Sequence, residues 1–251
     1  MKYIFGASNL ALLDRLRLCL PGNCLICGFP VRAVISLCRD CESLLPRNYQ
    51  CCAVCGVPVA TANRINRCGR CLLTPPPYTL TRCVFHYRQP VAELLADFKF
   101  HGNFASGRAL GLQLARAFFD HYAATQSLLG TQQFPQLIVP VPLHRRRLRE
   151  RGFNQSALLG RMMSDYTSVP VNTRLVIRRR QTEPQTRLTA RQRAINLHSA
   201  FKVTKKLVGP GFRHIAVIDD VVTSTATVRA VSHALLAAGA GRIDIWALAR
   251  A

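Results

Sequence analysis

Residues 215–228 constrain the fold more narrowly than any other stretch, because they join an apolar run, two acids and a hydroxyl-rich turn. The apolar run ends in Asp219 and Asp220, and helix-like sequence follows the turn as far as Gly239. This order predicts a buried strand, a turn and a helix whose free amides and dipole attract an anion, most naturally a phosphate. The carboxylates suit ribose hydroxyls or a hydrated Mg²⁺. A strand followed by a helix capped by Thr223 or Thr225 also explains the hydroxyls, but not two adjacent acids.

The stretch from Val217 to Thr227 resembles the phosphoribosyl-pyrophosphate (PRPP) motif of type I phosphoribosyltransferases, a hydrophobic strand and two acids followed by two apolar residues and Thr-Thr-Gly-x-Thr. The resemblance implies Mg²⁺ with PRPP as ligand and catalytic roles for Asp219 and Asp220. It implies substrate-binding roles for Val221, Val222, Thr223, Ser224, Thr225, Ala226 and Thr227. Family members usually carry glycine at the place of Thr225, where a β-branched residue makes a positive φ costly.

Eight of the eleven cysteines form four Cys-x-x-Cys pairs, which is the spacing of zinc ligands. The pairs are Cys24 with Cys27, Cys38 with Cys41, Cys52 with Cys55, and Cys68 with Cys71. Two pairs make one tetrahedral Cys₄ site, so we expect two structural zinc ions. Gly28 and Gly56 follow the first and third pairs, which indicates an internal duplication of a zinc-ribbon unit. A module this small cannot fold on its own apolar core, so the metals should hold it together.

The cysteine spacing leaves the ligand sets open. Sequential pairing assigns the first two pairs to one zinc and the last two to the other, whereas a cross-braced arrangement lets the first and third pairs share a zinc. Cys51 adjoins Cys52 and can substitute as a ligand, and iron–sulfur ligation is the alternative to zinc. Cys19 and Cys83 fit the role of small buried apolar residues.

The chain is strongly basic, with 34 Lys and Arg against 12 Asp and Glu and a formal charge of +22. This excess indicates a polyanionic partner, namely nucleic acid, phosphorylated metabolites or an acidic membrane face, with solvated surface charge as the simpler alternative. Arginine predominates, and its planar fork suits phosphate. One cluster comprises Arg145, Arg146, Arg147, Arg149, Arg151 and Arg161. A second comprises Arg174, Arg178, Arg179, Arg180, Arg187, Arg191 and Arg193.

The segment before the motif alternates between strand-like and helix-like patterns. Residues 82–87 and 136–142 read as strands, and residues 90–100 and 104–122 as helices. Such alternation predicts a parallel α/β sheet, in which ligands bind at the carboxyl ends of the strands.

After the strand of residues 136–142, the chain carries a Pro-x-Pro followed by an arginine run and Arg-Gly-Phe-Asn-Gln at 151–155. This resembles the signature of the ComF/GntX family, bacterial phosphoribosyltransferase-like proteins tied to natural competence and to the use of external DNA. Residues 95–102 and the Cys-Gly-Arg-Cys-Leu-x-x-Pro-Pro-Pro element at 68–77 extend the resemblance. It implies a type I phosphoribosyltransferase-like parallel sheet with helices on both faces, plus an N-terminal Cys₄ zinc-ribbon module.

The resemblance also implies roles for two loops. Residues 143–155 would handle pyrophosphate, with Arg147, Arg151 and Asn154 as candidate contacts, and residues 178–200 would be a mobile flap over the site. Residues 152–155 can equally begin a helix that runs to Tyr166, with Phe153 in the core, and such a helix end can still bind an anion.

We expect four parts along the chain: an amphipathic helix in residues 1–22, a double zinc-finger module in 23–73, a Pro-rich linker in 74–79 and a phosphoribosyltransferase-like domain in 80–251. No apolar run is long enough to cross a bilayer. We expect a cytoplasmic protein. In that reducing compartment, so many cysteines indicate metal binding rather than disulfides.

Three functions are compatible with these features. The chain can be an enzyme that transfers a phosphoribosyl group from Mg²⁺-PRPP to an unidentified acceptor. It can be a non-catalytic factor with a vestigial PRPP pocket that binds single-stranded DNA through its arginines. It can be a zinc-dependent scaffold that contacts a DNA-uptake helicase or translocase. We predict a compromise, a DNA-processing factor with a PRPP-type pocket, and the sequence leaves turnover open.

Overall fold

The computed structural model describes residues 22–32, 34–59, 66–129, 134–179, 200–207, 209 and 212–251. The amphipathic helix expected in residues 1–22 lies outside these ranges except for Gly22. Most of the expected flap also lies outside them, since only Arg178, Arg179 and Ala200 are described.

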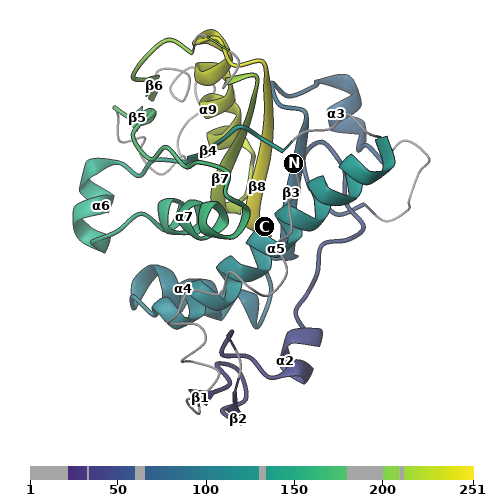
Figure 1. Ribbon diagram of the computed structural model, residues 1–251, viewed down its shortest axis with the longest axis vertical. Helices are drawn as coiled ribbons and strands as arrows, with labels where there is room; N and C mark the ends of the chain where they lie inside the picture. The colour runs from purple at the N-terminus through teal and green to yellow at the C-terminus, as the bar shows by residue number, and fades with distance from the viewer. Residues whose placement is uncertain are drawn as a thin grey trace.

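A four-stranded parallel sheet in the order β3-β8-β7-β4 forms the centre of the fold (Figure 1). Its strands are β3 (Leu80–His86), β8 (Arg242–Arg250), β7 (His214–Val222) and β4 (Leu137–Pro140). All of β4 and the seven central residues of β8 are buried, which explains their nearly continuous apolar sequence. Successive β7 residues point to opposite faces of the sheet and enter two separate cores.

Helices cover both faces of the sheet (Figure 1). The helices α4 (Val91–Phe100), α5 (Phe104–Leu129) and α7 (Gln155–Thr167) pack on one face around Phe98, Leu114 and Trp246, a cluster that we call the α5-side core. The helix α9 (Ala226–Ala237) and the strand pair β5 (Val176–Arg178) and β6 (Phe201–Val203) pack on the other face, the α9-side core. The short α6 (Arg145–Arg151) buries no residue.

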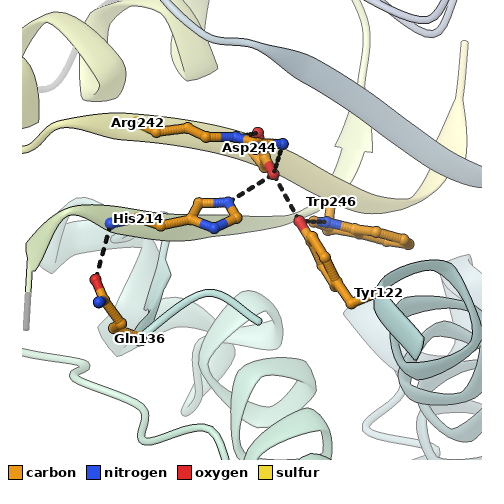
Figure 2. A network of polar contacts seen from close by, with 6 residues as sticks. All are labelled: Tyr122, Gln136, His214, Arg242, Asp244 and Trp246. Atoms are coloured by element: carbon orange, nitrogen blue, oxygen red, sulfur yellow. Dashed lines mark hydrogen bonds and ion pairs between the residues drawn. The ribbon is translucent and has the colours of Figure 1, made fainter. Parts of the chain in front are cut away.

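A buried carboxylate holds together the amino-terminal ends of β7 and β8 (Figure 2). Asp244 is fully buried and accepts hydrogen bonds from the Tyr122 hydroxyl at 2.7 Å, from His214 Nε2 at 2.7 Å and from both Nε and Nη2 of Arg242. Trp246 Nε1 in turn donates to the Tyr122 hydroxyl at 3.2 Å. Burial raises the pKa of Asp244, but His214 and these donors outweigh it, so its pKa lies below its usual value.

The N-terminal module docks on the free edge of β3. It contains β1 (Gly22–Asn23), β2 (Pro30–Val31), α2 (Arg39–Ser43) and α3 (Gly69–Leu73). Residues 46–53, which we call the connector, run antiparallel to β3: Asn48 N donates to Val84 O, and His86 N donates to Pro46 O. The first half of the module enters the α5-side core and the second half enters the α9-side core. The predicted fold class is confirmed as a parallel α/β sheet, helices on both faces and an N-terminal Cys₄ module.

Candidate metal centres and phosphate-binding site

Two clusters of four cysteines have the geometry of tetrahedral metal sites, with all ligand atoms of a cluster within 4.8 Å of one another. The first cluster contains Cys24, Cys27, Cys38 and Cys41, and the second contains Cys52, Cys55, Cys68 and Cys71. The Sγ atoms of Cys27 and Cys38 are 3.8 Å apart, and those of Cys55 and Cys68 are 3.6 Å apart. A Zn–S bond of about 2.3 Å in a tetrahedron requires sulfurs about 3.8 Å apart, so both clusters fit structural zinc.

The pairing is sequential, since each cluster uses consecutive Cys-x-x-Cys pairs, and the cross-braced alternative is excluded. Cys51 lies outside both clusters and is buried, so it does not act as the substitute ligand that its position allowed. Cys83 is buried within the α9-side core, as expected. Cys19 lies outside the described residues.

The two clusters repeat the same backbone turn, which supports an internal duplication. Gly28 and Gly56 adopt left-handed φ values of 73° and 70°, and their amides donate to the carbonyls of Cys24 and Cys52. Burial raises the pKa of the Cys24 thiol, but donated backbone amides outweigh it and lower the pKa to about 6. The same opposition lowers the pKa of Cys52 to about 7. In each cluster one thiol is therefore shifted toward the thiolate form that binds metal, while the pKa of the Cys41 thiol and of the Cys71 thiol is raised by neighbouring thiols and by burial.

The acid pair lies at the carboxyl end of β7, where the sequence placed it. Asp219 Oδ1 accepts from the Ser156 hydroxyl at 3.2 Å and from the Asp220 amide at 2.9 Å. Asp220 Oδ2 is 3.1 Å from Lys99 Nζ, and both side chains are largely buried. Residues from β7, α4 and α7 therefore meet at one point.

Burial sets the ionisation of the pair. Burial raises the pKa of Asp219 to about 7, and the neighbouring charge of Asp220 adds to this effect, whereas the Asp220 amide and Lys99 oppose it. Asp219 thus carries only part of its charge near neutral pH. A cation or a set of hydroxyl donors beside the carboxylate would restore that charge.

The loop after β7 keeps a backbone conformation that glycine normally provides. Thr225 has φ 66° and ψ −2° and precedes the first residue of α9. Thr223 and Ser224 are exposed, while Thr225 is buried. Val221 and Val222 end the strand, and Ala226 and Thr227 begin the helix. Thr225 therefore keeps a left-handed backbone conformation although its side chain is β-branched. The amino-terminal end of α9 follows an exposed turn.

The second Cys₄ cluster shares a core with the helix that follows this loop. Its cysteines belong to the α9-side core together with Tyr78 and with Val228 of α9. Arg229 Nη2 donates to the carbonyl of Thr74 at 3.3 Å, which ties α9 to the chain that leaves the second cluster. The second metal site and the helix α9 are therefore parts of one packed unit.

The arginine-rich helix α6 lies beside the acid pair. A cavity of about 390 Å³ is lined by residues that include Lys99, Arg147, Arg151 and Phe153. Arg147 is exposed, while the Arg151 guanidinium stacks on the Phe100 ring at 5.1 Å. Since Lys99 contacts both this cavity and Asp220, the two predicted arginines lie close to the acid pair.

Asn154 caps a helix, as the second reading of residues 152–155 predicted. Its side chain accepts from the Ala157 amide at 3.4 Å and donates to the Val141 carbonyl at 3.1 Å. The helix α7 begins at Gln155, and Phe153 packs against Phe98 with ring centroids 5.5 Å apart. These contacts place Asn154 at the junction of β4 and α7.

Sequence reasoning missed three residues of the site. Lys99 lies in segment 95–102, which resembles the family, but its position is equally typical of a solvated lysine at a helix end. Nothing in the local sequence around Ser156 predicts a role for its hydroxyl. Arg178 was expected only as part of a cluster and of the flap, yet it lies near enough for the charge of Asp219 to act on its guanidinium. Each side chain comes from an element distant in sequence from β7, so only tertiary packing reveals it.

Together these features define a class of protein, a parallel α/β protein in which a strand, an acid pair, a loop and a helix follow one another, with two N-terminal Cys₄ sites. A family model described as a double zinc ribbon domain matches residues 15–72. The chain is 35% identical to the DNA utilization protein YhgH of Escherichia coli over 93% of its own length and 99% of that protein. It is 31% identical to competence protein F of Haemophilus influenzae over 86% of its length and 90% of that protein. The chain therefore belongs to the family of these two proteins, which confirms the ComF/GntX resemblance.

A structural comparison finds adenine phosphoribosyltransferase from Leishmania tarentolae, at 14% identity and a TM-score of 0.34, covering 68% of this chain and 76% of that one. This similarity is too weak to support a conclusion. None of the helices within the described residues combines the length and apolarity needed to cross a membrane.

Proposed function

We propose that this protein binds Mg²⁺-PRPP at the carboxyl end of β7 and handles external DNA in the cytoplasm through a basic surface beside that pocket. The observation that carries the proposal is the left-handed Thr225 directly after the acid pair. A loop that had lost its role could relax to a conformation that threonine prefers, because a positive φ costs a β-branched residue of the order of 1–2 kcal/mol. Retention of that strain is typical of a functional loop.

The pocket would offer a hydrogen-bonding group to each part of PRPP. Asp219 and Asp220 would accept hydrogen bonds from the ribose hydroxyls, with Lys99 and Ser156 holding the carboxylates in place. The exposed turn at residues 223–224 and the amino-terminal end of α9 would hold the 5′-phosphate. Arg147 of α6 would contact the pyrophosphate, and the α7 end that Asn154 caps would flank it.

Mg²⁺ fits the acid pair, because carboxylate oxygens are its preferred protein ligands and Asp219 is only partly charged without a nearby cation. Bound with PRPP, the ion would neutralise pyrophosphate charge. In a transfer reaction, Asp219 and Asp220 would orient the ribose and stabilise positive charge that develops at its anomeric carbon.

The DNA side of the proposal rests on the family and on the surface around α6. The relatives' names connect them with DNA utilization and competence. Arg145, Arg147 and Arg149 are exposed, and the exposed rings of Phe100 and Phe104 lie in the same region, next to Arg151 and Phe153. Exposed arginines interleaved with aromatic rings favour single-stranded nucleic acid, since phosphates bind the cations and bases stack on the rings.

The test is a calorimetric titration of PRPP with and without Mg²⁺, accompanied by an assay for pyrophosphate release. Wild type should bind only with Mg²⁺, and Asp219→Asn and Asp220→Asn should each weaken binding about ten- to a hundredfold. Asp165→Asn is a matched control, because it removes one exposed carboxylate of α7 that lies outside the acid pair and the α6 cavity. Equal affinity of the wild type and both pocket variants would refute the PRPP pocket. Binding without pyrophosphate release, in the presence of candidate nucleobases and single-stranded DNA, would favour the non-catalytic alternative.

A further inference from the structure

A second cavity, of about 640 Å³, lies at the β3 edge of the sheet, between the connector and α5. It shares no lining residue with the acid pair, the loop after β7 or α6. Val84 and Trp246 contribute from the sheet, Asn48 and Tyr49 from the connector, and His121 from α5. A volume of this size is typical of sites for drug-sized molecules and cofactors.

Three buried polar atoms at this cavity have no hydrogen-bond partner within the part of the chain that the structure describes. They are Arg82 Nε of β3, His121 Nε2 of α5 and Asn48 Oδ1 of the connector. Native proteins rarely leave such groups unsatisfied, because each costs free energy on desolvation. These three atoms are themselves shielded from the cavity, but Arg82 and His121 are only partly buried, so other atoms of the same side chains can meet an occupant.

The charges around the cavity favour an anion. Arg116 pairs with Asp120 at 3.8 Å, and Gln113 bridges Arg47 and Glu42 by accepting from the arginine and donating to the carboxylate. Among the described residues, no carboxylate lies within ion-pair distance of Arg82. Burial, with a smaller contribution from the charge of Arg82, lowers the pKa of His121 to about 4, so this imidazole is neutral at pH 7 and the positive charge at the cavity is that of its arginines.

The cavity is rigid on one side and aromatic at its mouth. Trp246 is held by its hydrogen bond to Tyr122, which Asp244 anchors in turn (Figure 2). Tyr49 lines the cavity and is 82% exposed, so its ring is available to stack on a planar group. The site therefore combines a cationic interior with an aromatic rim.

We propose that this cavity binds a small phosphorylated ligand with an aromatic ring, a nucleoside monophosphate. Its phosphate would pair with the guanidinium of Arg82 beside His121, its base would stack on Tyr49, and its ribose hydroxyls would contact polar side chains of the connector. The assignment is independent of the PRPP pocket, because the two sites share no residue.

The chain has one tryptophan, so the fluorescence of Trp246 reports on this cavity. The experiment titrates the full-length zinc-loaded protein with AMP, adenosine and inorganic phosphate. AMP should change the fluorescence saturably and bind more tightly than either fragment. Arg82→Gln should weaken AMP binding about ten- to a hundredfold, because a charged hydrogen bond is lost, and Tyr49→Ser should weaken it less. Arg88→Gln, an exposed arginine just beyond β3, is the matched control and should bind like wild type.

Two measurements keep the result decisive. If Arg82→Gln fails to fold, NMR titration of His121 in the wild type replaces it, because a bound phosphate should raise the pKa of that imidazole. Arg147→Gln disables the α6 pocket and should leave AMP binding intact. The proposal is overturned if wild type shows no saturable response up to about 10 mM AMP, a concentration that detects even very weak sites. It is also overturned if Arg82→Gln binds as tightly as Arg88→Gln, if phosphate binds as tightly as AMP, or if Arg147→Gln abolishes binding.

Discussion

The left-handed conformation of Thr225 predicts an unusual order of stability among variants. With φ at 66°, an alanine at this position bears a strain of roughly 1–2 kcal/mol that glycine avoids. Glycine gains freedom in the unfolded chain, which costs it roughly 0.4–1 kcal/mol relative to alanine. The difference leaves Thr225→Gly more stable than Thr225→Ala by about 0.8 kcal/mol, although glycine is ordinarily the more destabilising residue.

The assay is urea unfolding of zinc-loaded protein at a single protein concentration. Unfolding is monitored by the fluorescence of Trp246, whose side chain is buried in the sheet. Ser168 is a matched control, because it also has a positive φ, 61°, but ends α7 away from the loop. Glycine should be more stable than alanine at both positions, while only the Thr225 variants should change PRPP affinity, with Thr225→Gly binding at least as well as wild type. If alanine proves equal to or more stable than glycine at position 225, the loop does not have this conformation, and the argument for a retained phosphate loop fails.

Three further predictions follow from the metal sites, the surface charge and the core. Elemental analysis should find two zinc ions per chain. Cys71→Ser should weaken PRPP binding more than Cys38→Ser, because the second site shares a core with α9, which begins at the loop; equal effects would contradict this coupling. Replacing Arg145 and Arg149 by Gln should lower the salt slope of single-stranded DNA binding by about one unit for each lost phosphate contact, and an unchanged slope would remove α6 from the interface. The pKa of His121 is lower in the folded protein, about 4, than in the unfolded chain, so its neutral form stabilises the fold above pH 6.5 and that stability is lost as pH falls toward 4. Between pH 7 and pH 4.5, wild type should therefore lose more unfolding free energy than His121→Gln, of the order of 1–2 kcal/mol because the side chain is partly exposed and screened by solvent, and equal losses would refute the shift.

Much of the secondary structure could be predicted from local pattern. The strand expected at residues 82–87 is β3 at Leu80–His86, and the helix expected at residues 90–100 is α4 at Val91–Phe100. The strand at 136–142 is shorter than expected, Leu137–Pro140, and the helix from Phe104 runs further, to Leu129. The division into residues 1–22, 23–73, 74–79 and 80–251 stays a prediction, although the connector beside β3 ties the second part closely to the fourth.

What the sequence determined by itself are the features whose information is local. Four Cys-x-x-Cys pairs specify metal ligands, and an apolar run followed by two acids, hydroxyl residues and a helix specifies a strand that ends in an acid pair, a turn and a helix, where we propose the anion site. The tertiary structure decided the partners. It paired the cysteines sequentially, set Lys99 against Asp220, joined Asp244 to Trp246 through the Tyr122 hydroxyl, and formed a cavity that Arg82 and His121 line. The physical reason is distance along the chain: these side chains meet only when separate helices and strands pack on one sheet, and local periodicity carries no record of which elements will be neighbours.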